Sequence, residues 1–169
     1  YSKLLNPQNE VFEKNDLVHL NPHVFSNINL KEDFRDCHDI EFLMESLNYL
    51  PQIEKKGFEE HLEGNAIYPN NMFITKVKYF KEYCTLIFPW LEKCYKFGLD
   101  KNLYNGYNKR LIAFLMERFS SYWFQRFKNK NQLSYCRLGK IHLSNKINKF
   151  VPTIKMPLSF LQYPTLHKF

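Results

Sequence analysis

The chain has 169 residues, which is about the length of one domain and enough to bury a hydrophobic core. It lacks the run of roughly 18 apolar residues that a transmembrane helix requires, and its first residues do not have the pattern of a signal peptide. Four cysteines without a C-x-x-C pair argue against a zinc site and fit reduced thiols in a cytosolic protein. Each cysteine has apolar or aromatic neighbours, which predicts a position in the core.

The charge is distributed unevenly along the chain. The net charge is +7, from 24 basic and 17 acidic residues, and no acidic residue follows Glu117. From Arg126 onward, basic residues alternate with aromatic ones, a composition that suits a polyanion or an anionic membrane surface. A merely solubilising surface is the alternative. We therefore divide the chain into a domain over residues 1–130 and a basic, aromatic tail over residues 131–169.

The first predicted elements occupy residues 16–50. Residues 16–20 are typical of a short strand, which the breaker Asn21-Pro22 ends. A capping box of Asn29 and Glu32 predicts the start of one continuous helix that extends to about residue 50. Its helical spacing predicts an apolar face made of Cys37, Ile40, Leu43, Met44 and Leu47, and a polar face made of His38, Glu41 and Glu45.

The remaining elements complete a mixed α/β fold that is rich in helix. A helix is expected over residues 52–63, and residues 72–75 are predicted as a short buried strand leading into a helix from Lys76. Pro89 should kink or restart that helix, because proline removes a backbone donor. A loop over residues 99–106 precedes a helix over residues 107–128, and candidate strands follow at 137–143 and 150–154.

The helix over residues 107–128 carries charges within an apolar sequence. One stripe roughly 100° wide holds Tyr107, Arg110, Phe114, Glu117, Arg118 and Ser121. The other faces are apolar, so the helix should be mostly buried and its charged stripe should be paired or face a cleft. Glu117 and the two arginines could form a structural ion-pair network with a neighbouring element. Alternatively, Arg110 or Arg118 binds an anion such as a diphosphate, which suits the fork of a guanidinium group.

A second candidate site lies in the earlier helix. Asp36, His38 and Asp39 fall within one predicted helical turn, an arrangement that can hold a metal or a general base. An exposed or carboxylate-paired histidine is the alternative, because His38 shares its predicted face with two glutamates.

Several short motifs in order resemble a known family. The segments NNMFITKVKYFKEYCTLIFPWLEK and YNKRLIAFLMERFSSYWF are similar to the second half of the bacterial domain-of-unknown-function 4422 family. Its members are candidate glycosyltransferases of capsule, exopolysaccharide and lipopolysaccharide assembly. The matching residues are Asn71, Met72, Phe73, Ile74, Tyr83, Cys84, Tyr107, Arg110, Phe114, Glu117 and Arg118. The segment DFRDCHDIEFL is similar to the aromatic-x-x-x-His segment of the family and aligns His38 with the family histidine.

This resemblance implies the acceptor-side, C-terminal half of a GT-A-like glycosyltransferase. Such an enzyme moves a sugar from a nucleotide-sugar donor to a glycan or lipid-linked acceptor of a cell-surface polysaccharide or lipopolysaccharide. The resemblance implies catalytic roles for His38 and Asp39. It implies substrate binding by Asn71, Tyr107, Arg110, Glu117 and Arg118.

The donor-binding half of the family has no counterpart in this sequence, which also lacks an Asp-x-Asp motif. We therefore expect no metal site or cofactor in this chain, and Mg²⁺ or Mn²⁺ only in a full-length enzyme. The expected location is the cytoplasm, with the tail attached peripherally to the anionic inner face of the cytoplasmic membrane. A non-catalytic remnant or a membrane-docking scaffold is the alternative. A nucleic-acid-binding module is disfavoured, because the basic residues do not gather on one predicted element.

Overall fold

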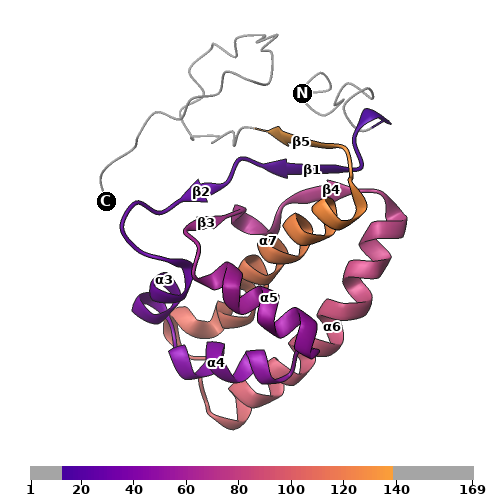
Figure 1. Cartoon of the computed structure of the whole chain (residues 1–169). Helices are drawn as coiled ribbons and strands as arrows, with labels where there is room; N and C mark the ends of the chain where they lie inside the picture. Colours follow the sequence, from indigo (N-terminus) through magenta and orange to yellow (C-terminus); the bar gives the residue numbers. More distant parts are fainter. Residues whose placement is uncertain (1–12, 139–169) are drawn as a thin grey trace, which may run out of the picture.

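A computed structural model of the chain describes residues 13–138 and shows a small sheet at one end of a group of helices (Figure 1). The three-stranded sheet has the order β4-β1-β5. The helix-rich α/β class predicted from the sequence is confirmed.

The central strand β1 (Leu17–Leu20) confirms the strand predicted there. It pairs antiparallel with β4 (Phe73–Thr75) and parallel with β5 (Tyr135–Leu138). Asp16, just before β1, holds the three strands together. Its backbone carbonyl accepts a hydrogen bond from the Thr75 hydroxyl at 2.8 Å, and its carboxylate accepts one from the Ser134 hydroxyl at 2.9 Å. A two-stranded sheet of β2 (His23–Val24) and β3 (Ala66–Ile67) lies beside the first.

Strand β5 overlaps the strand predicted at residues 137–143 but begins at Tyr135. The first residues of the predicted tail therefore belong to the sheet. The rest of the tail, including the strand predicted at residues 150–154, lies outside the described residues.

Strand β4 leads into a helix after Lys76, as predicted, but the prediction that it is buried is wrong. Met72 and Ile74 expose half or more of their side chains. The cause is its position at the edge of the sheet and the alternation of side chains along a strand. Phe73 points inward, with its ring centroid 4.2 Å from that of Phe124, whereas Ile74 points outward.

The predicted helix over residues 29–50 is two helices, α3 (Leu30–Cys37) and α4 (Ile40–Asn48). The capping box is confirmed, since the Asn29 side chain accepts a bond from the Glu32 amide and Glu32 accepts one from the Asn29 amide. The prediction of continuity is wrong, because His38 and Asp39 have extended backbone conformations. The Asp39 carboxylate accepts a 2.8 Å hydrogen bond from the Phe42 amide and so caps a new helix.

The predicted apolar face is confirmed for Leu43 and Leu47, which are buried. It is wrong for Cys37 and Met44, which are exposed, and Phe34 and Phe42 face the core in addition. The expectation that every cysteine lies in the core is therefore wrong for Cys37. All four cysteines are free thiols.

The other helices lie close to their predicted positions. Helix α5 spans Gln52–Leu62, and α6 spans Val77–Asp100 without restarting at Pro89. A short 3₁₀ helix, η2 (Gly106–Arg110), leads into α7 (Leu111–Asn131). A second, η1 (Pro69–Asn71), precedes β4.

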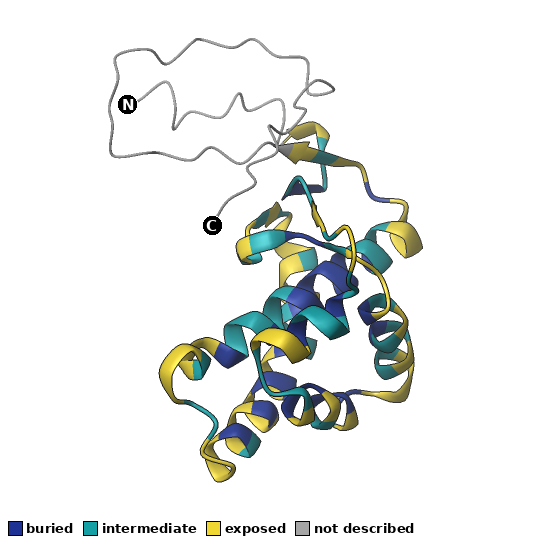
Figure 2. Cartoon of the chain, turned by 90° about the vertical axis from the view of Figure 1, so that its left-hand side faces the viewer, coloured by how far each residue is buried: buried dark blue, intermediate teal, exposed yellow. Residues whose placement is uncertain are grey.

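Helix α7 is the centre of the core, which Figure 2 shows as the dark region where the helices meet. Phe119 contacts Phe58 of α5 and Trp90 of α6, with ring centroids 5.1 and 4.5 Å away. Neighbouring elements surround α7, so polar residues on it must find partners inside the protein. The residues that line the candidate site come from η2, the N-terminal half of α7 and the break between α3 and α4.

Candidate functional site

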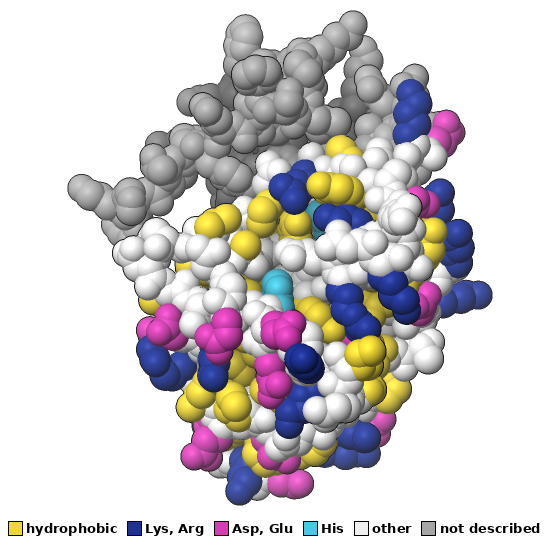
Figure 3. All heavy atoms as spheres, viewed as in Figure 1, with side chains coloured by type: hydrophobic (Ala, Val, Ile, Leu, Met, Phe, Trp, Pro, Cys, Tyr) yellow, Lys and Arg dark blue, Asp and Glu magenta, His cyan; other side chains and the backbone are white. Residues whose placement is uncertain are grey.

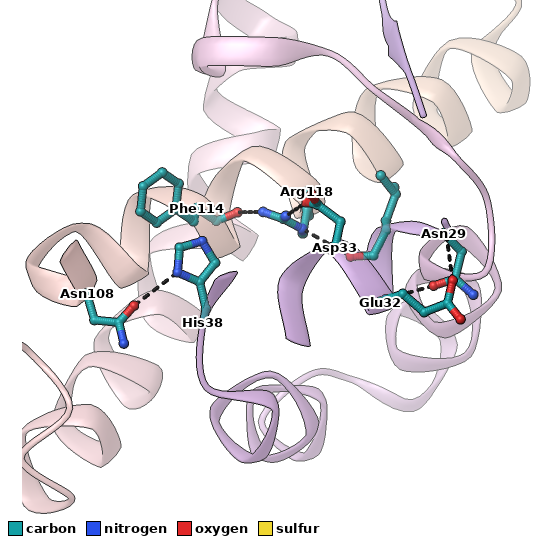
Figure 4. Close-up of polar contacts among 8 residues, drawn as sticks. Asn29, Glu32, Asp33, His38, Asn108, Phe114 and Arg118 are labelled. Atoms are coloured by element: carbon teal, nitrogen blue, oxygen red, sulfur yellow. Dashed lines mark hydrogen bonds and ion pairs between the residues drawn. The ribbon is translucent and has the colours of Figure 1, made fainter. Parts of the chain in front are cut away.

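His38 lies at the break between α3 and α4, where its ring meets η2 and the start of α7 (Figure 4). Its Nδ1 is 3.0 Å from the side-chain oxygen of Asn108. The imidazole stacks on Phe114 at 4.3 Å between centroids and lies parallel to the ring of Tyr107 at 5.5 Å. Contacts from three sides therefore fix the orientation of this half-buried histidine.

The bond to Asn108 determines which nitrogen of His38 is a base. A carboxamide oxygen only accepts hydrogen bonds, so Nδ1 carries the proton and Nε2 has a free lone pair. Among the described residues, no hydrogen bond reaches Nε2. Burial lowers the pKa of His38, although the bond to Asn108 opposes that effect. The imidazole is thus neutral at pH 7 and can accept a proton through Nε2.

Tyr107 and Arg110 present exposed groups beside His38. The Tyr107 side chain is 66% exposed, and its ring lies 5.1 Å from that of Phe114. The Arg110 guanidinium sits 5.3 Å from the centroid of the same Phe114 ring. No acidic side chain of the described region forms a salt bridge with Arg110. An aromatic face, a free cation and a neutral base thus lie next to one another.

Arg118 is buried and its donors are used within the protein (Figure 4). It forms an ion pair with Asp33 of α3 and donates hydrogen bonds to the carbonyls of Leu30 and Phe114 at 3.4 and 3.1 Å. Its guanidinium also lies 4.8 Å from the ring centroid of Phe34. Arg118 therefore holds α7 against α3. Of the two arginines predicted to bind an anion, only Arg110 is open to solvent.

Asn71 and Glu117 bind η1 to α7. The Glu117 carboxylate accepts a hydrogen bond from the Asn70 amide, and the Asn71 side chain donates one to the Ala113 carbonyl at 3.2 Å. Asn70 and Asn71 both have positive φ angles, of 66° and 51°, so these bonds hold an unusual turn.

The expected ion pairing with a neighbouring element is confirmed for Arg118, which pairs with Asp33 of α3. Glu117 instead accepts a backbone hydrogen bond from η1, and no salt bridge within residues 13–138 includes Arg110. Adjacent residues of a helix project about 100° apart, so Glu117 faces η1 while Arg118 faces α3.

Asp39 and Asp36 do not join His38 in one helical turn. Asp39 caps α4, and Asp36 forms an exposed pair with its neighbour Arg35 at 2.9 Å. Within residues 13–138, no cluster of three or more His, Cys, Asp or Glu side chains could hold a metal ion. Two surface hollows of about 320 and 250 Å³ lie along α3, α4 and α5, and neither is lined by His38.

Asn108 is the site residue that the sequence did not indicate. It lies 70 residues from His38 along the chain, and polar residues before a helix are common for local reasons. The only signal was its position next to Tyr107, a residue that the family resemblance had marked.

A comparison with protein families decides the assignment of this chain. A family model described as Domain of unknown function (DUF4422) matches residues 4–131. The chain belongs to this family. No curated protein and no solved structure matches it. The site residues from Asp33 to Arg118 all lie within the matched part of this DUF4422 chain. None of the helices in the described region is long and apolar enough to cross a lipid bilayer.

Proposed function

We propose that this DUF4422 chain is the acceptor-side part of a GT-A-like bacterial glycosyltransferase that acts on a cell-surface polysaccharide or lipopolysaccharide. The observation that carries the proposal is the neutral His38, whose Nδ1 is bound to Asn108 and whose Nε2 is free. The resemblance to candidate glycosyltransferases supplies the reaction class. The arrangement of Tyr107, Arg110 and His38 supplies groups that such a reaction requires.

In this proposal His38 is the general base for the acceptor. An acceptor hydroxyl attacks the anomeric carbon of the donor sugar and forms a new C–O bond as the bond to the nucleoside diphosphate breaks. The hydroxyl proton passes to His38 Nε2, which must lie within about 3 Å of the hydroxyl oxygen. The exposed face of Tyr107 supports a sugar ring, and Arg110 binds a phosphate of the donor or of a lipid-linked acceptor.

The other predicted residues have supporting roles in the proposal. Arg118, Glu117 and Asn71 hold the elements that carry the site, as their contacts with α3 and η1 indicate. Asp39 sets the start of α4. Because no described group fits a metal, no step is assigned to one. The nucleotide-sugar donor and any Mg²⁺ or Mn²⁺ are assigned to a donor half outside this sequence.

The test compares turnover in the full-length enzyme with a nucleotide-sugar and an acceptor analogue. His38→Ala should lower kcat by about 10²–10⁴-fold, the usual contribution of a general base. Arg110→Ala should mainly raise KM. His23→Ala is the control, since His23 is exposed on β2. Thermal unfolding of each variant separates a lost base from a lost fold. Equal turnover of wild type and His38→Ala would show that His38 takes no part in the chemistry. A wild-type protein that neither binds nor turns over substrate would favour the alternative, a non-catalytic remnant or membrane-docking scaffold.

We also propose that the basic segment after Leu138 attaches the enzyme to the inner face of the cytoplasmic membrane. Five lysines and no acidic residue lie in this segment. Each lysine near an anionic bilayer contributes about 1 kcal/mol. Because β5 belongs to the sheet, the truncation that tests this should begin at residue 139. Liposome sedimentation should show binding to anionic but not neutral vesicles, and the truncated chain should not bind. Binding that ignores lipid charge contradicts the mechanism.

A further inference from the structure

A histidine in the central strand is buried without a hydrogen bond to any other described residue. His19 of β1 is 4% exposed. Its ring stacks on Tyr68 at 4.5 Å between centroids and meets Phe124 of α7 edge-on at 5.6 Å. Burial, together with the charges of Lys128 and Arg137, lowers the pKa of His19 to about 4, so the imidazole is neutral at pH 7. A neutral imidazole keeps one N–H donor, and a buried donor normally has a partner. His19 therefore has a donor that the described residues leave unused.

Two basic side chains lie beside this histidine, and both contact the ring of Tyr135. Arg137 of β5 is the register partner of His19, so the two side chains project from the same face of the sheet. Tyr135, two residues earlier on β5, shares that face. The Lys128 Nζ lies 3.8 Å from the Tyr135 ring centroid, and the Arg137 guanidinium lies 5.6 Å from it. We call His19, Lys128 and Arg137 the sheet cluster, which β1, α7 and β5 bring together.

No described acidic side chain neutralises the sheet cluster. Neither Lys128 nor Arg137 forms a salt bridge with a described residue, and no acidic residue follows Glu117 in the sequence. Asp16, at the opposite end of β1, pairs with Lys76 at 2.6 Å. In the upper part of Figure 3, where the sheet lies in Figure 1, basic and hydrophobic side chains surround a histidine, with no acidic side chain between them. The two cations are therefore available to an anion from outside the protein.

The chemistry of the sheet cluster fits a phosphate group. Two cations balance the double negative charge of a phosphomonoester, and the guanidinium fork can bind two of its oxygens. A third oxygen can accept the hydrogen bond that His19 donates. A carboxylate has one charge and two oxygens, so it would satisfy the cluster less completely. Lys128 lies about 21 Å along α7 from Phe114, so this cluster is separate from the site at His38.

We propose that the sheet cluster is a second binding site, in which Arg137 and Lys128 balance the charge of a phosphate group and His19 donates a hydrogen bond to it. The phosphate group belongs to a soluble compound, such as a nucleoside diphosphate, or to the headgroup of a phospholipid. Binding at this cluster does not require the proposed glycosyl transfer, and it is measured without turnover.

The first test is a nuclear magnetic resonance titration of the full chain with inorganic phosphate at pH 7 and constant ionic strength. Saturable shifts are expected for the His19 ring and for the amides of β1, β5 and the last turn of α7. Arg137→Gln and Lys128→Gln should each weaken binding at least about tenfold, because each removes a charged hydrogen bond. His19→Phe keeps an aromatic ring against Tyr68 but removes the N–H, and it should weaken binding about tenfold.

Lys130→Gln is the matched control for this titration. Lys130 is exposed on the same helix and loses the same charge, so the variant should change the affinity by less than about twofold. Circular dichroism checks the fold of each variant, and the exposed Arg137→Gln decides the outcome if His19→Phe does not fold. Equal weakening by Lys128→Gln and Lys130→Gln, or a wild type without saturable binding, overturns the proposed site.

A second test distinguishes the two sources of the phosphate group. It compares Arg137→Gln with Lys130→Gln, which have the same net charge, in sedimentation with phosphatidylcholine vesicles that contain phosphatidic acid and in titration with uridine diphosphate. A lipid headgroup predicts that Arg137→Gln binds the vesicles more weakly than Lys130→Gln does. A soluble ligand predicts equal binding to the vesicles and weaker binding of uridine diphosphate by Arg137→Gln. Equal behaviour of the two variants in both assays overturns the proposed site.

Discussion

Removal of the Asp33 carboxylate tests whether the buried ion pair holds α3 against α7. The Arg118 side chain is 5% exposed and that of Asp33 is 17% exposed, so Asp33→Ala leaves a guanidinium inside the protein without its counter-charge. Breaking a buried pair in this way destabilises proteins by about 3–5 kcal/mol. Arg118 keeps its hydrogen bonds to two carbonyls, which places the expected loss near the lower limit, at about 3 kcal/mol.

Urea unfolding measures this loss, and the exposed Asp36 on the same helix provides the control. With a slope of about 2 kcal/mol per molar urea, the midpoint of Asp33→Ala should fall by about 1.5 M. Asp36→Ala removes an exposed pair with Arg35 and should cost below about 1 kcal/mol. Combining Asp33→Ala with Arg118→Met should recover part of the loss, because the double variant buries no unpaired charge. Equal midpoints for Asp33→Ala and Asp36→Ala would show that the guanidinium escapes to water and that the reasoning fails.

Three further predictions concern stability. Burial lowers the pKa of His61 from 6.5 to about 4, and its Nε2 finds no hydrogen-bond partner among the described residues. The neutral imidazole therefore stabilises the fold above about pH 6.5, and roughly 2 kcal/mol of the free energy of unfolding should be lost by about pH 5. His61→Leu should reduce this loss in urea unfolding at the two pH values, whereas the exposed His23→Leu should not. Gly57→Ala should lower Tm in calorimetry despite its higher helix propensity, because the added Cβ would lie 2.6 Å from the Tyr122 hydroxyl; a raised Tm would show that Tyr122 moves aside. Asn29→Ala should cost about 1 kcal/mol in the same urea assay, and no change would mean that the capping box adds nothing.

The elements that the sequence predicted well depend on local signals. The capping box at Asn29 and the strand at residues 17–20 arise from interactions within a few residues, and both are confirmed. The burial of residues 72–75 depends instead on where the strand lies in the sheet, and no local pattern contains that information. A run of apolar residues can be a central strand or an edge strand, because only the partners of the strand differ.

Contacts between distant segments limited the prediction of the site. The family resemblance marked His38, Tyr107 and Arg110, and the structure places them together around Phe114. Their roles in binding and catalysis stay predictions. The partner of Arg118 is 85 residues away along the chain, so the helical stripe could show that a partner was needed but could not identify Asp33.

The break between α3 and α4 explains both the error in the helix prediction and the position of the site. The apolar periodicity continues across residues 38 and 39, so a pattern of period 3.6 cannot detect two extended residues between helices that both face the core. In a continuous helix, His38 would share the solvent face with Glu41 and Glu45. The extended backbone at His38, with φ −144° and ψ −175°, instead accompanies a ring that lies against Phe114 and Asn108. Asp39 favours this conformation because its side chain caps α4, which stabilises a second helix that begins at Ile40 over one helix that continues through residues 38 and 39. Asp39 therefore influences the position of the His38 ring through the backbone, because it fixes where α4 begins.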